Sequence, residues 1–387
     1  MAIFASVLAA CLIPQLTGLS LRVPEVLSFA VASMILVGVG LADDLLELSP
    51  AARFVAETLA ALVMVFGADV ILADLGHMSL SGGRLELGIA ALPFTIFATI
   101  GVINALNMCD GLDGLSGSQT LVSLTGFGLA IALHGGHADI GLLLVLAGSV
   151  IGFLLFNMRL PGRLRASIFL GDAGSMFLGF ALTWFAISLS QGSDPVIKPA
   201  AALWFITVPI MDAVAMMLRR IVRGRSPFSP DREHLHHVFL LAGFDVNQTV
   251  GAMALLGAGG VAVGLAGTWF DVPDLVLAGG FLLAGILYFW MIMRSWRRMR
   301  FLGRSICRRR SAVPDRRCRA DRRQASDDSR LPAVERRSGH ERRRAVPRRA
   351  GDGQHAYPGS AAGDLPTADG TSGATDAVPG ESTGEQA

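Results

Sequence analysis

The chain has 387 residues, of which 52% are hydrophobic and 17% are charged, and its mean hydropathy is +0.52. A soluble domain carries about 25% charged residues on average, so this composition argues against an ordinary water-soluble fold. The net charge of +2 hides a strongly basic stretch near the C-terminus and an acidic end after it. Four cysteines at unrelated spacings predict neither a disulfide framework nor a zinc motif.

Apolar segments of about 20 residues, long enough to cross a membrane, recur along the chain. We expect about ten transmembrane helices, near 2–20, 26–42, 51–66, 89–107, 118–134, 140–157, 173–190, 200–218, 246–268 and 275–293. The weakest segment contains Arg53 and Glu57 and is retained mainly because the loop charges require an even number of spans. A water-soluble bundle would not need so many uncharged helices. The sequence therefore predicts an all-α polytopic integral membrane protein.

Arginine is distributed unevenly between the two sets of loops that these spans define. The first set, around 43–50, 108–117, 158–172 and 219–245, holds Arg159, Arg163, Arg165, Arg219, Arg220, Arg223, Arg225 and Arg232. The opposite loops hold Arg22, Arg84 and Lys198. Because basic loops are retained in the cytoplasm, we expect the first set and both termini there. The first apolar run lacks a basic leader, so we do not interpret it as a cleaved signal.

Each loop of the arginine-rich set carries an unusual polar cluster. The first is Asp43-Asp44, directly after an uncharged span. Two adjacent carboxylates repel each other unless cations or water neutralise them. Taken alone, the pair is also compatible with a plain hydrophilic helix end.

The second cluster is NALNMCDGLDGL over residues 104–115. A spacing of three keeps Asn104 and Asn107 on one helix face. The glycines that follow end the helix, so that Asp110 and Asp113 can turn toward the same point. Two amides and two carboxylates suit a hydrated divalent cation or the polar edge of a ligand. An ordinary Asp-Gly turn is the alternative, and the repetition of the pattern argues against it.

The third cluster is FLGDAGS over residues 169–175, at the start of an uncharged span. Glycines beside an acid allow close backbone approach, and a helix N-terminus favours anions such as phosphate. Because Asp172 is itself negative, we interpret it as a ligand of the Mg²⁺ that would hold the phosphates. If Asp172 served only as a helix N-cap, the glycines and the serine beside it would not be required.

The fourth cluster lies in the long loop 219–243, which contains SPFSPDREHLHH. Arg232, His234, His236 and His237 offer the donors and positive charge that phosphates need. The histidine spacing lacks the HExxH arrangement, which disfavours zinc.

Two further polar residues are candidates because they fall in or at the end of a span. Asp212 lies within the span that leads into the histidine loop, and Asn157 ends another. A buried acid inside a membrane indicates function by default.

From residue 296 onward the composition changes to repeated RR and RRR runs and then to a Gly/Ala/Asp/Thr-rich end. Such a segment cannot bury a core, so we expect residues 296–387 to be a disordered tail, basic and then acidic. Its basic half could contact anionic lipid head groups, or it could be a solvated tail that helps fix topology; RNA binding is a weaker option. Residues 1–295 would form the transmembrane domain.

These clusters, in this order, resemble the polyprenyl-phosphate N-acetylhexosamine-1-phosphate transferase family, also called glycosyltransferase family 4. The resemblance covers nearly all of 1–300 and rests on Asp-Asp after a span, NxxNxxDGxDGL, FxGDxGSxxxGF and the SPFSPDRxHxHH loop followed by AGF. The SPFSPDR run favours the branch that uses undecaprenyl phosphate and UDP-N-acetylglucosamine over the peptidoglycan branch. The resemblance implies a bacterial inner-membrane enzyme of cell-surface polysaccharide synthesis, such as that of O-antigen, with its site facing the cytoplasm.

The resemblance implies a role for each cluster. A phosphate oxygen of the lipid would attack the β-phosphorus of the nucleotide sugar and release UMP. Mg²⁺, with Mn²⁺ as an alternative, would bind Asp172 and Asn107. Asp43 or Asp44 would act as base or positioner, although a phosphate monoester is largely dianionic at pH 7 and needs little deprotonation. A covalent aspartyl-phosphate route is also open. The substrate-binding residues would be Asn104, Asn107, Asp110, Asp113, Asn157, Arg232, His234, His236 and His237.

Family members normally begin with a further span and a basic, glycine-rich cytoplasmic loop, whereas here Met1 opens directly into the next span. We expect either that the true start lies further upstream or that the protein is shortened and lacks this loop. The alternatives to this function are a sister enzyme that uses a different UDP-N-acetylhexosamine and an inactive, truncated protein that acts as a scaffold. A transporter would carry its charges near mid-membrane, whereas here they collect at one surface. The expected partners are the two substrates and the lipid bilayer, a homodimer is an option, and no nucleic acid is expected.

Overall fold

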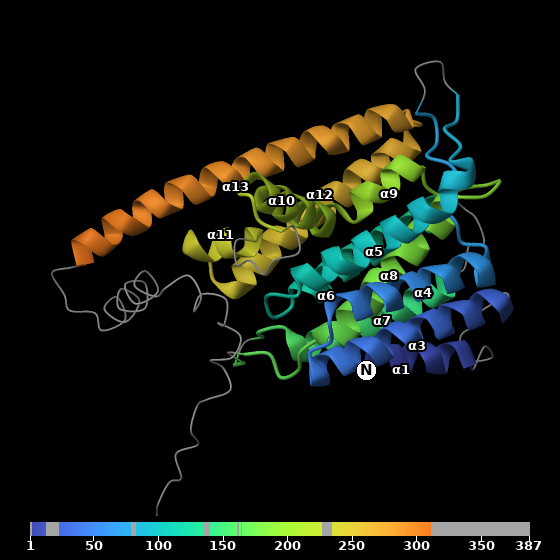
Figure 1. The fold of residues 1–387 in the computed structure, drawn as a ribbon, viewed down its shortest axis with the longest axis horizontal. Coiled ribbons are helices and arrows are strands. Elements are labelled where there is room, and N and C mark those ends of the chain that lie inside the picture. The colour runs from blue at the N-terminus through green and yellow to red at the C-terminus, as the bar shows by residue number, and fades with distance from the viewer. Residues whose placement is uncertain are drawn as a thin grey trace, which may run out of the picture. The chain divides into compact units, whose positions relative to one another are not determined.

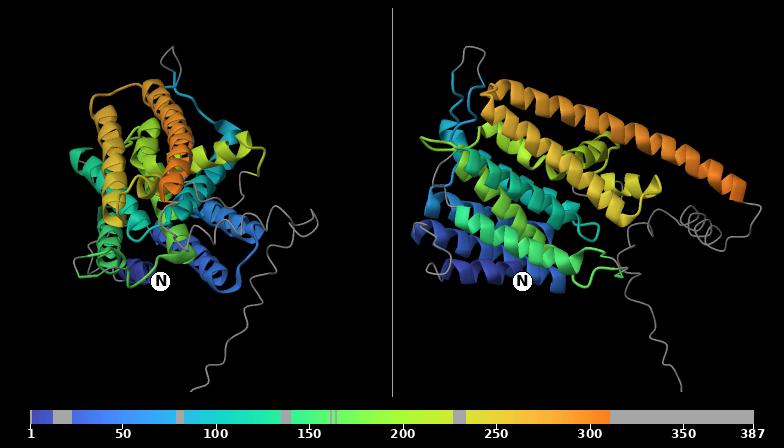
Figure 2. Two further views of the ribbon diagram at one scale, coloured as in Figure 1. Left: turned by 90° about the vertical axis from the view of Figure 1, so that its left-hand side faces the viewer. Right: turned by 180° about the vertical axis from the view of Figure 1, so that it is seen from behind.

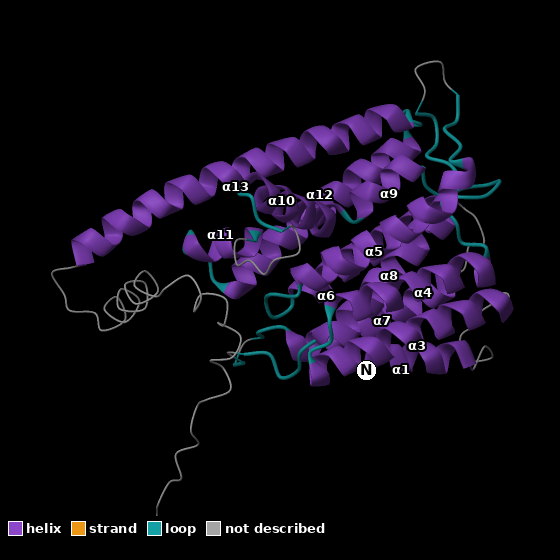
Figure 3. Ribbon diagram, in the orientation of Figure 1, coloured by secondary structure: helices purple, strands orange, loops and turns teal. Residues whose placement is uncertain are grey.

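The computed structural model describes residues 2–12, 23–78, 83–134, 140–160, 162–163, 165–226 and 234–310. Its elements are α1 (Ala2–Leu12), α3 (Val23–Leu46), α4 (Pro50–Ala68), the short 3₁₀ helix η1 (Gly88–Ala90), α5 (Ala91–Cys109), α6 (Leu115–His134), α7 (Ile140–Asn157), α8 (Gly171–Ser190), α9 (Pro199–Phe205), α10 (Thr207–Val222), α11 (Leu235–Leu241), α12 (Val246–Trp269) and α13 (Asp274–Arg310). Helices and loops account for the described part of the chain (Figure 3), apart from one isolated antiparallel bridge between Asp74 and Glu86. The predicted all-α class is confirmed.

Among the described residues, eight helices are long and apolar enough to cross a membrane, or nine if the bent pair α9–α10 forms one span. They correspond to the predicted spans, and the weak segment at 51–66 is helix α4. The first predicted span, 2–20, begins as α1, but residues 13–22 lie outside the described part. The polytopic membrane architecture is therefore confirmed, with the number of spans close to the ten expected.

Helix α8 lies at the centre of the bundle, and nearly all of its residues are buried (Figures 1 and 2). Glycines bring its neighbours close: a Cβ on Gly40 of α3 would lie 2.4 Å from the Cα of Ala173. Likewise, a Cβ on Gly179 of α8 would lie 2.7 Å from the Cα of Ile103 in α5. Small residues at such contacts are the usual means by which membrane helices pack. Helices α3 and α5 thus bring their polar ends to the start of α8.

The predicted span 200–218 is not one straight helix, because α9 and α10 meet at an angle of 84°. The physical cause is Pro209, which has no N–H to donate to the carbonyl of Phe205 four residues earlier. The hydroxyl of Ser123 in α6 donates to that carbonyl instead, at 2.7 Å. A break in a spanning helix is tolerated where a neighbouring side chain satisfies the freed backbone group in this way.

In the connections at the right-hand end of the helices in Figure 1, two side chains accept hydrogen bonds from backbone N–H groups. Gln191 accepts the N–H groups of Ala73 and Asp74 at 2.9 and 3.1 Å. The buried carboxylate of Asp274 accepts the N–H groups of His77 and Ala200 at 2.8 and 3.2 Å. The connections at this end are therefore held by the first residue of α13 and the residue after α8.

Helix α13 continues to Arg310 rather than ending near 295, where the sequence predicted the tail to begin. Residues 311–387 lie outside the described part of the chain. The disordered tail therefore stays a prediction.

We predict that Gly40→Ala lowers the melting temperature of the detergent-solubilised protein by several degrees, whereas Gly38→Ala leaves it unchanged or raises it slightly. A methyl group on Gly40 would overlap the Ala173 backbone, whereas one on Gly38 meets nothing within 4 Å. Overpacking costs about 1–3 kcal/mol, and alanine in place of a helical glycine gains roughly 1 kcal/mol in propensity. Thermal unfolding followed by tryptophan fluorescence compares the two. Equal melting temperatures would contradict the close α3–α8 contact.

Candidate active site

The α3–α4 turn brings Arg53 back beside Asp43. Pro50 starts α4, and the Ser49 side chain caps it by accepting the N–H of Ala52. Within the turn, Asp43 accepts the N–H of Leu48 at 2.8 Å and an Nη1 hydrogen of Arg53 at 3.0 Å. The Asp43 carboxylate is buried, and both its oxygens are used by groups of this turn. Asp43 is therefore held in place by its own local structure.

Arg53 joins the first three polar clusters. Its Nη1 lies 3.5 Å from Asp172 Oδ2, in addition to the contact with Asp43. Its Nη2 donates to Asn107 Oδ1 at 3.1 Å. Sequence reasoning missed this role and treated Arg53 as a weakness of its span. The signal was available, because an arginine in a membrane segment faces the bundle interior and pairs with acids or carbonyls.

Asn107 connects α5 to the start of α8. Its Nδ2 donates to Asp172 Oδ1 at 2.6 Å and to Ser175 Oγ at 2.9 Å. With one amide the residue thus contacts a carboxylate, a hydroxyl and the guanidinium of Arg53. The FLGDAGS and NALNMCDG segments, predicted to lie at one surface, are brought into direct contact.

Asp44 lies against the first residues of α8. Its Oδ1 accepts the backbone N–H of Asp172 at 3.1 Å. Gly171 has φ +69°, and a Cβ there would lie 2.7 Å from Asp44 Oδ2. A side chain at this position would be strained and would push Asp44 away. The glycine predicted to allow close approach therefore does so, and Asp44 remains exposed.

Asn104 lies one turn deeper in α5 and has a different partner. Its Nδ2 donates to Glu57 Oε2 at 2.7 Å and to the carbonyl of Ile100 at 2.9 Å. Glu57 is fully buried, so Asn104 satisfies an acid within the helices. The structure thus separates Asn104 from the Asn107–Asp172 contact.

Asp113 and Asn157 hold the loop after α7 against the loop after α5. Arg159 Nε donates to Asp113 Oδ2 at 2.7 Å. Asn157 Oδ1 accepts the N–H of Gly114 at 2.7 Å, and its Nδ2 donates to the carbonyl of Ile168 at 2.7 Å. Both residues organise the rim, while Asp110 is exposed between them and Asp172.

The histidine loop reaches the same end of the bundle. A Cβ on Gly111 would lie 2.7 Å from the Cε1 and Nε2 atoms of His236, so the two loops touch there. The His236 ring is buried, its centroid lies 4.2 Å from that of His237, and it stacks 5.5 Å from His234. Arg232 lies outside the described residues.

Burial, together with the neighbouring His237 and His234 rings, lowers the pKa of His236 from 6.5 to about 4. The ring is therefore neutral at pH 7. Neutral His236 fills the space beside Gly111 and supplies no positive charge, so the fixed charge of the described site comes from Arg53 and the acids.

The acid cluster fits a hard divalent cation in its chemistry. Asp43 and Asp172 both lie against Arg53 Nη1, and Asp44 accepts the backbone N–H of Asp172. Carboxylate and amide oxygens are the ligands that Mg²⁺ prefers. Arg53 supplies one positive charge to Asp43 and Asp172. Among the described residues, no group of three or more His, Cys, Asp or Glu side chains is arranged to hold a metal by itself. Amide, water or substrate oxygens would therefore complete such a site.

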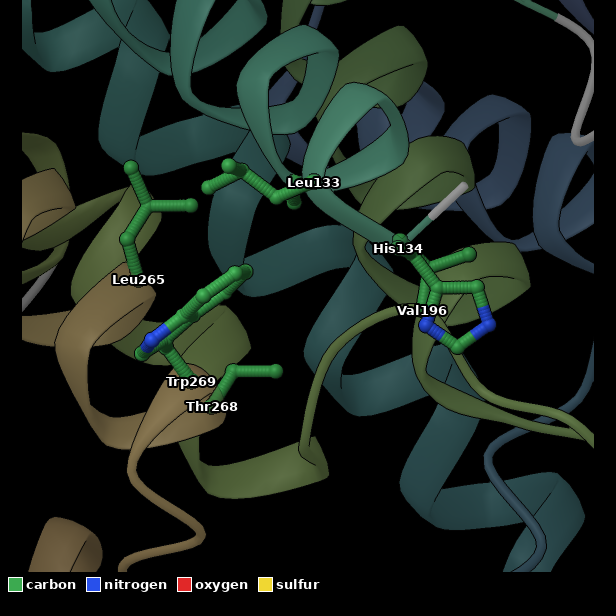
Figure 4. Close-up of a pocket in the computed structure, with 7 residues that line it drawn as sticks. Leu133, His134, Val196, Leu265, Thr268 and Trp269 are labelled. Atoms are coloured by element: carbon green, nitrogen blue, oxygen red, sulfur yellow. The ribbon is translucent and has the colours of Figure 1, made fainter. Parts of the chain in front are cut away.

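A pocket of about 260 Å³ lies at the opposite end of the helices, near Leu133, Leu265 and Trp269 (Figure 4). Of the described residues that line it, His134 alone is titratable, and its Nε2 lies 3.3 Å from Asp194. This pocket has neither the acids nor the arginine of the other end. The candidate active site is therefore the Asp43–Arg53–Asn107–Asp172 cluster with the histidine loop beside it.

This fold and site define a class of helical membrane protein in which acids, amides and a partly buried arginine gather at one end of the spans. Residues 26–190 match the family described as glycosyl transferase family 4. The chain is 36% identical over 292 residues to an undecaprenyl-phosphate alpha-N-acetylglucosaminyl 1-phosphate transferase of Yersinia pestis, covering 75% of this chain and 80% of the relative.

Proteins with the same description in Escherichia coli K12 and Haemophilus influenzae are 34% and 33% identical, over 73% of this chain and 77% and 79% of theirs. The protein belongs to glycosyl transferase family 4. The resemblance drawn from the four clusters is thereby confirmed, and the family match spans the first three of them.

We predict that the folded protein loses stability between pH 6.5 and pH 4 through His236. Its folded pKa of about 4 lies below the unfolded value of 6.5, so the unfolded chain takes up the proton first and is favoured as the pH falls. From these values the loss is on the order of 2 kcal/mol at pH 5. His236→Gln removes this component, whereas His77→Gln, at an exposed position of the other end, keeps it. Melting temperatures measured from pH 7.5 to 5 test this; parallel curves for the wild type and His236→Gln would contradict it.

Proposed function

We propose that the protein transfers N-acetylglucosamine-1-phosphate from UDP-N-acetylglucosamine to undecaprenyl phosphate and releases UMP. A phosphate oxygen of the lipid forms a bond to the β-phosphorus of the nucleotide sugar, and the bond from that phosphorus to the oxygen of the α-phosphate breaks. The lipid phosphate is largely dianionic at neutral pH, so no base need remove a proton. The observation that carries the proposal is the contact network of Arg53 with Asp43, Asp172 and Asn107, in a member of this family.

The physical difficulty of this reaction is that one phosphate must approach another. Arg53 contributes a fixed positive charge beside Asp172, and the histidine loop lies against the acid-rich loop at Gly111. Asp172 and Asp44 are the residues that would hold Mg²⁺, with Asn107 as a further oxygen ligand, and Mn²⁺ would serve in its place. When bound, the ion neutralises diphosphate oxygens and so lowers the repulsion between the reacting groups.

The two adjacent acids have different tasks in this proposal. Asp43 is buried, and its oxygens are taken by Leu48 and Arg53, which suits a residue that positions the arginine. Asp44 is exposed and shares one oxygen with the N–H of Asp172, so it is the acid of the pair that can face a metal ion or the lipid phosphate.

The remaining predicted site residues belong to the nucleotide side. Asp110 is exposed next to the cluster and can contact the nucleotide directly. Asp113 and Asn157 act through the loops that they hold together. Asn104 acts through Glu57. Arg232 and His237 remain predicted contacts of phosphate or sugar.

The protein is a multi-pass inner-membrane protein, and we place its active site at the cytoplasmic surface. The arginine-rich loops and the acid cluster share one end of the bundle, and basic loops are retained in the cytoplasm. The nucleotide sugar carries a charged diphosphate, which does not cross an apolar bilayer unaided, so a donor in the cytoplasm stays on that side of the membrane. Lipid acceptor and soluble donor would meet at that surface.

We predict Mg²⁺-dependent transfer of radiolabel from UDP-N-acetylglucosamine into lipid, with equimolar UMP, by membranes that contain the full chain. Asp172→Asn should reduce the rate at least 100-fold, because the amide cannot neutralise a divalent cation. Asp194→Asn, whose side chain is 84% exposed at the opposite end, is the matched control and should keep the wild-type rate.

The outcomes of this assay distinguish the proposed function from its two alternatives. Transfer from a different UDP-N-acetylhexosamine only would replace the donor and keep the chemistry. Absence of transfer from every donor by a correctly folded chain would favour the inactive scaffold and overturn the proposal.

We predict that a cysteine at Ser167 is shielded from a membrane-impermeant thiol reagent in intact spheroplasts, whereas one at Ser193 is labelled. Both serines are exposed, Ser167 in the loop after α7 and Ser193 in the loop after α8. The background would replace Cys11, Cys109, Cys307 and Cys318. Permeabilised spheroplasts should label both positions, and the reverse pattern in intact ones would invert the proposed orientation.

A further inference from the structure

Behind the histidine loop, a buried carboxylate collects donors from two other helices and from the loop itself. Asp212 of α10 is 1% exposed. Its Oδ2 lies 2.9 Å from His234 Nδ1, and its Oδ1 accepts the N–H of Leu235 at 3.1 Å. The same Oδ1 accepts the hydroxyl of Tyr288 in α13 at 2.9 Å. These three donors belong to this chain, so the acid is satisfied without solvent.

This arrangement fixes His234 in two ways. The backbone bond to Leu235 holds the first residue of α11 against α10. Because an ionised carboxylate only accepts hydrogen bonds, the hydrogen at Nδ1 is committed to Asp212. Nε2 is then the ring nitrogen left for a ligand, and its direction is set by the fixed ring.

A plain structural role does not explain the choice of an acid at this depth. Burying a carboxylate in a membrane segment costs several kcal/mol unless it is paired. The N–H of Leu235 and the hydroxyl of Tyr288 both donate to Oδ1, so one acceptor oxygen is enough for these two bonds. Only the bond to the His234 ring needs the second acceptor oxygen.

We propose that Asp212 and Tyr288 are positioning residues that hold His234 so that its Nε2, which carries no hydrogen, accepts a hydrogen bond from a sugar hydroxyl group of the nucleotide donor. Tyr288 fixes the rotamer of Asp212, and Asp212 fixes the ring and its tautomer. The inference rests on the proposed function for its substrate, but the placement of the ring hydrogen is a property of the free protein. It also gives α13 a part in the site, through a residue far from the sequence motifs.

The sharpest variant is Asp212→Asn. Its amide oxygen can keep the bonds to Leu235 and Tyr288, but its NH₂ group then faces His234 Nδ1 and forces the ring hydrogen onto Nε2. The shape is retained while the hydrogen-bonding character of Nε2 is reversed. Asp274→Asn is the matched control, because Asp274 is equally buried but accepts the backbone N–H groups of His77 and Ala200 instead of binding a histidine ring nitrogen, and it lies at the opposite end.

The first readout is a double-mutant cycle on the purified full-length enzyme. We expect Asp212→Asn to lower kcat/KM for the nucleotide sugar at least tenfold, with a melting temperature no lower than that of Asp274→Asn. In a His234→Gln background, Asp212→Asn should change kcat/KM by less than twofold, because Asp212 acts through that ring. Tyr288→Phe should give a smaller loss, two- to fivefold, that also disappears in this background. Independent, additive losses would overturn the inference.

The second readout does not depend on activity. In protein labelled with ¹⁵N-histidine, the signals absent from His234→Gln identify His234. The Nδ1 resonance should be that of a protonated nitrogen in the wild type, and in Asp212→Asn the hydrogen should appear at Nε2. An unchanged spectrum would overturn the inference even in an active enzyme. If the wild type transfers no sugar but the tautomer switches as expected, the proposed function fails and the positioning of His234 stands.

Discussion

The architecture of the site depends on one cation, the guanidinium of Arg53. Asp43 and Asp172 come from helices far apart in sequence, and their negative charges would repel each other at a membrane boundary. Arg53 lies between them and also binds Asn107, so one side chain of α4 links α3, α5 and α8. A charge at membrane depth costs about 2.5–3.5 kcal/mol on insertion scales, and the pairing offsets this cost for arginine and acids together. Removing the arginine would leave the acids without that compensation.

The other half of the site depends on how α10 is directed. Pro209 breaks the span, and Ser123 takes up the carbonyl that the break frees. Beyond the 84° bend, α10 carries Asp212 to the position where the histidine loop and Tyr288 meet it. The two halves touch at Gly111, where a side chain would displace His236. A glycine in the acid-rich loop thus determines how closely the histidines approach it.

Much of this could be predicted from the sequence, because hydrophobic length and charged loops are read along the chain. The spans, and the gathering of Asp43, Asn107 and Asp172 at one end, follow from that pattern alone. Contacts between helices do not follow, since periodicity says which face a residue occupies but not what lies opposite. For that reason Arg53 was read as a flaw in its span and Asn104 was grouped with Asn107, although its partner is Glu57.

The bend at Ile206 was missed for a related reason. Pro209 was visible in the sequence, but a proline in an apolar run predicts a kink or a break without deciding between them. The hydroxyl of Ser123, from another helix, binds the carbonyl that the break frees, and this contact allows the full break in an apolar environment. Tyr288 could not be anticipated either, because nothing in the α13 sequence distinguishes it from an interfacial tyrosine.

The two carboxylate centres differ in what can replace their partners. Asp212 is 1% exposed and its three donors belong to the chain, so nothing from the cytoplasm competes for it. The Asp172 side chain is 33% exposed, and its contact with Arg53 is long, at 3.5 Å. A cation can therefore replace Arg53 at Asp172, and an anionic substrate can replace Asp172 at Arg53, because neither partner has to leave a sealed environment. Charged partners can therefore be exchanged at the acid cluster, whereas the geometry of the histidine side stays fixed.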